Sequence, residues 1–87
     1  MEVREAVALA KRYVGELFVD EPIGELGLEE VEFDESSGTW LITIGFLRNW
    51  SRGGIEAFAP KKRDYKVVRI LDADKKMISV KNREPAD

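Results

Sequence analysis

Apolar residues near the start of the chain recur at intervals of three and four positions. This spacing is typical of an amphipathic α-helix, and it extends over residues 3–18. The apolar face of the predicted helix carries Val3, Val7, Ala10, Val14 and Leu17. Beyond it, Pro22, Gly24 and Gly27 predict a loop.

From residue 28 onward, apolar and polar residues alternate, which is typical of half-buried β-strands. The alternation predicts four strands, at residues 28–34, 39–47, 64–71 and 76–81. Short turns join the first strand to the second and the third to the fourth, and Gly38 suits a positive φ in the first turn. The sequence therefore predicts one α+β domain over 1–87, with an N-terminal helix packed on a four-stranded antiparallel meander sheet.

One face of each predicted strand is strongly apolar, and we expect this face to pack against the helix. In the second strand the row is Trp40, Ile42, Ile44 and Phe46. Its companions on the other strands are Val31, Phe33, Val68, Ile70, Ile78 and Val80.

The opposite face of the sheet is not convincingly polar. It carries Leu41, Thr43, Gly45 and Leu47 on the second strand, and Tyr65, Val67, Arg69 and Leu71 on the third. The exposed face of an antiparallel sheet is usually polar. We therefore expect this face to be covered by a loop, by another copy of the chain or by a partner, with an aromatic ring filling the gap at Gly45.

The connection between the second and third strands, residues 48–63, is much longer than the roughly two to five residues that a hairpin needs. It contains two aromatic residues, Trp50 and Phe58, and the pair Gly53-Gly54, which suits a hinge or a tight turn. Its basic residues are Arg48, Arg52, Lys61, Lys62 and Arg63.

The net charge of −3 conceals an asymmetry along the chain. Residues 1–47 carry three basic against eleven acidic side chains, a net charge of −8, whereas residues 48–87 carry eleven basic against six acidic, a net charge of +5. Such polarity favours pairing of two copies or attraction of a charged partner. Within one domain, the two halves also neutralise each other.

Histidine and cysteine are both absent from the sequence. Their absence excludes Ser-His-Asp and Cys-His catalysis and ordinary zinc sites. No apolar run approaches the roughly 20 residues that span a bilayer, and the N-terminus does not resemble a signal peptide. We therefore expect a cytoplasmic protein that does not enter a membrane.

Three segments, "AVALAKRYV", "GTWLITIGF" and "DYKVVRILDADKKMISVKN", resemble a PepSY-like small domain. More closely, nearly the whole chain resembles a family of small, uncharacterised bacterial proteins with the pattern "GLEEVEFDE…W.ITIGF.R.W…YKVVRI". The resemblance implies a PepSY- or cystatin-like fold and, through relatives that restrain proteases, a protease-inhibitor-like module. The residues shared with the family, Trp40, Tyr65 and Val67, are structural. The chain departs from the pattern at Lys75-Lys76, where the family has Thr-Gly, and in the long connection.

Other chemistries have weaker support in the sequence. The basic and aromatic residues of 48–63 are of the types that bind an anionic ligand or nucleic acid, but the acidic balance of the domain argues against nucleic acid. The acidic run from Glu29 to Glu35 lacks the glycine-bearing loop of a calcium site. We expect no catalytic residues, no metal and no cofactor.

The sequence thus favours a small non-catalytic protein-interaction or regulatory module that associates with itself or with another protein. Its predicted contact surface combines the second sheet face with the 48–63 connection, since aromatic and arginine residues commonly anchor interfaces. The predicted interface residues are Leu41, Leu47, Arg48, Trp50, Arg52, Phe58, Tyr65 and Val67.

Overall fold

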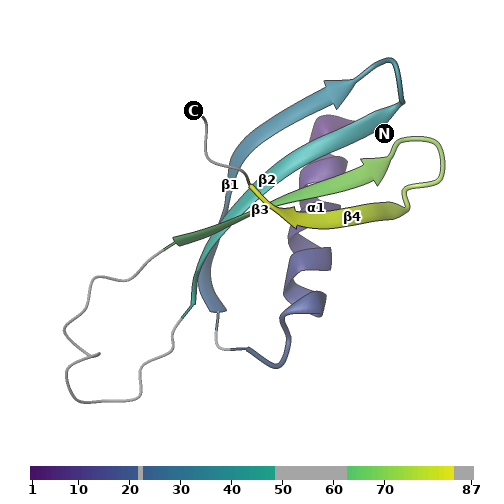
Figure 1. The fold of residues 1–87 in the computed structure, drawn as a ribbon. Helices are drawn as coiled ribbons and strands as arrows, with labels where there is room; N and C mark the ends of the chain where they lie inside the picture. Colours follow the sequence, from purple (N-terminus) through teal and green to yellow (C-terminus); the bar gives the residue numbers. More distant parts are fainter. Residues whose placement is uncertain (22, 49–62, 84–87) are drawn as a thin grey trace, which may run out of the picture.

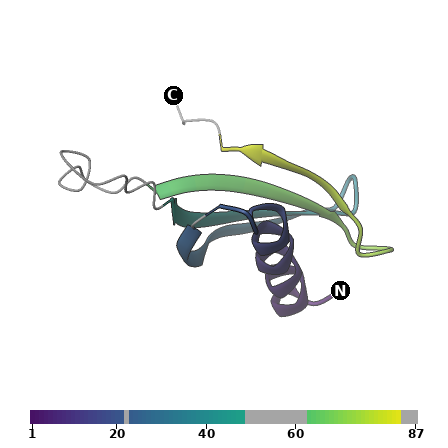
Figure 2. The same ribbon diagram turned by 90° about the horizontal axis from the view of Figure 1, so that it is seen from below.

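A computed structural model describes residues 1–21, 23–48 and 63–83, and for Arg48 it describes the backbone alone. The elements are α1 (Val3–Leu17), β1 (Ile23–Asp34), β2 (Thr39–Arg48), β3 (Arg63–Leu71) and β4 (Met77–Asn82). The strands form one antiparallel sheet in the order β1-β2-β3-β4, and α1 lies across one face of it (Figures 1 and 2). The predicted α+β arrangement of one helix on a four-stranded meander is confirmed.

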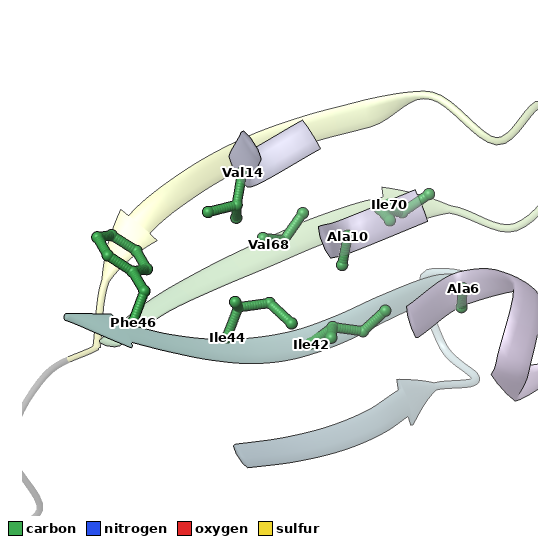
Figure 3. Packing of buried hydrophobic residues seen from close by; sticks show 8 residues of the cluster. All are labelled: Ala6, Ala10, Val14, Ile42, Ile44, Phe46, Val68 and Ile70. Atoms are coloured by element: carbon green, nitrogen blue, oxygen red, sulfur yellow. The ribbon is translucent and has the colours of Figure 1, made fainter. Parts of the chain in front are cut away.

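The core lies between α1 and the middle two strands (Figure 3). The helix contributes small residues at four-residue spacing, Ala6, Ala10 and Val14, which allow it to approach the sheet closely. The strands contribute Ile42, Ile44, Phe46, Val68 and Ile70, all fully buried. This is the apolar row predicted from the alternation, although the helical stripe is narrower than expected, because Val3 and Leu17 are 46% and 54% exposed.

The prediction of a loop around Gly24 and Gly27 is wrong for residues 23–27, which belong to β1. The pairing of β1 with β2 is irregular there, with a register shift between the two glycines and a positive φ of 50° at Glu25. An irregular strand tolerates glycine better than a regular one does. The other strand boundaries agree with the predicted ones to within one residue.

Two β-bulges reverse the predicted orientation of side chains at the edge strands. In β1, strict alternation with Val31 and Phe33 would place Glu29 in the core row. Leu28 pairs with Ile44 but Glu30 pairs with Thr43, so Glu29 is instead an extra residue. In β4, Ile78 is the extra residue, because Ile70 pairs with Met77 and the preceding β3 residue, Arg69, pairs with Ser79. Ile78 is 52% exposed, and Met77 packs against the core instead.

Hydrogen bonds and an ion pair connect α1 and β2 to the turn between β3 and β4. The hydroxyl of Tyr13 donates to the carbonyl of Lys75 at 3.0 Å, and Nζ of Lys75 lies 2.7 Å from the carboxylate of Glu5. The indole N–H of Trp40 donates to the carboxylate of Asp72 at 2.9 Å. This bond, together with the Met1 α-amino group, lowers the pKa of Asp72.

Candidate functional site

The face of the sheet opposite α1, which we call the open face, is covered by no helix among the described residues (Figure 2). Two cross-strand rows define its centre, each running from β1 to β4. The first row is Glu30, Thr43, Val67 and Lys81, and the second is Glu32, Leu41, Arg69 and Ser79. In both rows the side chain on β1 is acidic, and the basic side chain lies on β3 or β4.

A shallow hollow of about 400 Å³ lies on the open face. Leu41, Thr43 and Val67 line it from β2 and β3, together with Val31. Three charged side chains complete the lining, Glu30, Glu32 and Arg83. The hollow therefore joins apolar side chains from the middle of the sheet to a charged rim.

The side chain of Arg63 crosses the open face from β3 to β1. Its Nη2 donates to Oε1 of Glu29 at 3.1 Å, and its Nη1 donates to the carbonyl of Glu25 at 3.2 Å. The crossing passes over Gly45, where a Cβ would stand 2.8 Å from both Arg63 Nη2 and Glu29 Oε1. The gap at Gly45 is thus filled by an ion pair and not by the aromatic ring that the sequence predicted.

Arg83 crosses the same face from the end of β4. Its backbone N–H donates to the carbonyl of Tyr65 at 3.1 Å, and its guanidinium carbon lies 5.8 Å from the centre of the Tyr65 ring. Its Nη2 also lies 3.9 Å from a carboxylate oxygen of Glu30 on β1. The positive ends of two arginines are therefore directed toward the acidic strand, while the apolar positions between them stay accessible.

The structure places half of the predicted interface residues on the open face. Leu41, Leu47 and Val67 are partly buried on the open face, and Tyr65 is 37% exposed. Leu41 and Val67 share the hollow. The other predicted residues lie outside what the structure describes, namely the side chain of Arg48 and all of Trp50, Arg52 and Phe58.

Sequence reasoning missed the three charged residues of the hollow and misplaced Arg63. Glu30 and Glu32 belong to the acidic run from Glu29 to Glu35, for which the sequence indicated no binding role. Arg83 follows the last predicted strand, and nothing in the sequence links it to Glu30. Arg63 was assigned to the basic connection, yet it is the first residue of β3.

The described residues offer little for metal or membrane chemistry. No group of three or more acidic side chains in them is arranged to hold a metal ion. Their single helix is too short and too polar to cross a bilayer. The open face offers apolar side chains and charges of both signs, which can make non-covalent contacts with another molecule.

Comparisons with protein-family models, curated proteins and solved structures found no match to this chain. The resemblance to PepSY-like domains therefore stays a prediction that rests on the sequence pattern.

Proposed function

We propose that the chain is a small, non-catalytic protein-interaction module that binds a second copy of itself through the open face. The observation that carries this proposal is the order of side chains in the first cross-strand row, Glu30, Thr43, Val67 and Lys81. This row begins with an exposed carboxylate on β1 and ends with an exposed cation on β4, with a hydroxyl and an apolar side chain between them. A row ordered in this way is complementary to itself after a two-fold rotation. In the second row the cation is Arg69 on β3, which the same rotation places opposite Leu41 of the second copy.

The geometry of such a pairing follows from the sheet. A two-fold axis parallel to the strands, between β2 and β3, turns the second sheet to face the first and reverses its strand order. Residues keep their level along the strands in this operation. Glu30 of one copy then lies opposite Lys81 of the second copy, and Thr43 lies opposite Val67. Packed sheets stand about 10 Å apart, within reach of long side chains from both copies.

The open face is smaller than the contact surface of a typical stable dimer. Four strands spaced about 4.8 Å apart and a central strand of ten residues give a surface roughly 15–20 Å wide and about 30 Å long. Stable interfaces commonly bury about 800 Å² on each partner. We therefore expect association that is weak and sensitive to salt, because exposed charges contribute to it.

The test is sedimentation of the purified chain over a range of concentrations. We expect a mass that rises toward the dimer, and a weaker dimer when either charge is reversed, in Glu30→Lys or in Lys81→Glu. The double variant should recover much of the association, because the opposed pair is restored with its signs exchanged. Asp20→Lys, an exposed site beyond the end of α1, is the matched control and should behave as the wild type.

A strictly monomeric chain at millimolar concentration would refute self-association. A dimer that ignores both charge reversals but is lost in Leu17→Lys, on the exposed side of α1, would refute the open face as the contact surface. Binding of a different protein by a chain that stays monomeric would also contradict the proposed partner.

A further inference from the structure

A second surface, independent of the open face, is an apolar groove between α1 and the edge strand β1. It has a volume of about 410 Å³ and is lined by Val3, Val7 and Ala8 of the helix and by Leu28 of β1. Val3 and Leu28 are 46% and 42% exposed, so the groove is open and is not filled by the core. Its volume lies within the range of about 300–1,000 Å³ that is usual for small-molecule sites.

Two cations complete the lining of this groove, Arg4 and Lys11. They are seven residues apart on α1, which is two turns and a separation of about 10 Å along the helix axis. Both are exposed, and neither forms an ion pair with any other described residue. The apolar floor therefore has a free cation near each end.

The placement of these cations is unusual for this chain. Residues 1–47 contain only three basic side chains against eleven acidic ones. Two of the three line the groove, while the third, Arg12, pairs with Glu16 and does not line the groove. Positive charge in the acidic half is thus concentrated where exposed apolar surface is also found.

The groove does not suit an added β-strand. The pairing of β1 is interrupted by two register shifts, and Glu25 has a positive φ, so its free edge is not a regular template. Exposed carboxylates at Glu30 and Glu32 would also repel an acidic peptide laid along that edge. A small ligand that needs only the apolar floor and one cation fits these features better than an extended polypeptide does.

We propose that the groove binds an amphiphilic carboxylate, such as a medium-chain fatty acid. The hydrocarbon part covers Val3, Val7 and Leu28, and it removes apolar surface from water at both partners. The carboxylate lies at one end of the groove, where it accepts charge-assisted hydrogen bonds from Arg4 or Lys11. This site is separate from the open face and does not depend on self-association.

The experiment is titration of the 87-residue chain with sodium dodecanoate below its micellar concentration, in which backbone amide chemical shifts and calorimetry measure the binding. We expect saturable binding, with the largest shifts at residues 3–11 and at Leu28. Dodecyltrimethylammonium, which has the same tail and the opposite charge, should bind at least tenfold more weakly. Octanoate should also bind more weakly than dodecanoate, because it covers less of the floor.

The variant Arg4→Gln/Lys11→Gln should lose at least tenfold in affinity for dodecanoate. Both sites are exposed, so the variant should keep the circular dichroism spectrum of the wild type. Arg12→Gln is the matched control, because it removes a cation from the same helix outside the groove, and its affinity should not change. Equal binding of the cationic and anionic amphiphiles, unchanged affinity in the double variant, or binding of an acidic peptide without binding of dodecanoate would each overturn the proposal.

Discussion

The guanidinium of Arg63 lies over the backbone of Gly45, with Nη2 2.8 Å from the position that a Cβ on Gly45 would occupy. Gly45 lies in the middle of β2, and its φ is not positive, so its backbone conformation is open to other residues. The absence of a Cβ leaves room for the flexible ends of Arg63 and Glu29, which would have to shift if a Cβ were present. Because Gly45 on β2 has no side chain, the side chain of Arg63 on β3 can reach Glu29 on β1.

Substitution of Gly45 by alanine should affect the stability of the fold differently in two backgrounds. In the wild type, the new Cβ displaces the ends of Arg63 and Glu29 and weakens their ion pair, which offsets the gain from a less flexible unfolded chain. In the Glu29→Ala/Arg63→Ala background the Cβ meets no ion pair, and the substitution should stabilise the fold by roughly 0.5–1 kcal/mol.

Urea unfolding of the four proteins measures this coupling. The effect of Gly45→Ala should be about 1 kcal/mol more favourable in the background that lacks the pair. An equal effect in both backgrounds would mean that Arg63 does not occupy the space above Gly45.

Lys75 is expected to be a strained position, because its φ of 62° lies in the left-handed region that favours glycine. The variants Lys75→Ala and Lys75→Gly both remove the contact with Glu5, so a comparison of the two isolates the backbone. Lys75→Gly should melt about 4–8 °C above Lys75→Ala in a thermal scan. Equal melting temperatures would show that the turn does not hold a left-handed residue at this position.

Asp34 should contribute to stability in a way that depends on pH. Hydrogen bonds donated by the side chains of Ser36 and Ser37 hold the pKa of the Asp34 carboxyl below its usual value. A lowered pKa in the folded state contributes stability above the unfolded-state pKa of about 3.9, and that contribution is lost as the pH falls through the folded-state pKa.

The double variant Ser36→Ala/Ser37→Ala should therefore raise the pKa of Asp34, as followed by the carboxyl carbon resonance. Its stability deficit relative to the wild type should be present at pH 6 and should shrink below pH 4. An Asp34 pKa that the two substitutions leave unchanged would contradict the hydrogen-bonded turn.

Two isoleucines that the alternation assigned to the same core should respond very differently to truncation. Ile42 is fully buried, and Ile42→Ala should cost about 2–5 kcal/mol, enough to unfold much of a small domain. Ile78 is 52% exposed beside a bulge, and Ile78→Ala should cost less than about 1 kcal/mol. Denaturant unfolding compares them directly, and similar costs would place Ile78 in the core after all.

The sequence predicted the elements of this fold because its periodic signals are local. The three- and four-residue spacing of α1 and the alternation of β2 each lie within one element, and both were interpreted correctly. Gly38 was also correctly predicted to take a positive φ, and its φ is 63°. Each of these features depends only on residues close together in the chain.

The errors have a common physical cause, which is that a β-bulge changes the side-chain period without a clear local signal. Alternation therefore placed Glu29 and Ile78 on the wrong faces. The contacts that Arg63 and Arg83 make across the open face could not be predicted either. Arg63 and Glu29, for example, are 34 positions apart in sequence. Contacts of this kind depend on the register between strands, which composition and periodicity do not determine.

The boundary between β2 and β3 divides the charge of the chain as well as the sheet. Nine cross-strand pairs, from Thr39 with Leu71 to Leu47 with Arg63, join a half that carries −8 to a half that carries +5. The domain is therefore suited to fragment complementation. A cut between Gly53 and Gly54 gives one peptide with five basic against eleven acidic side chains, a net charge of −6, and one with nine basic against six acidic, a net charge of +3. The two peptides should attract each other and reassemble at low ionic strength, and the recovery of sheet signal in circular dichroism on mixing would measure this.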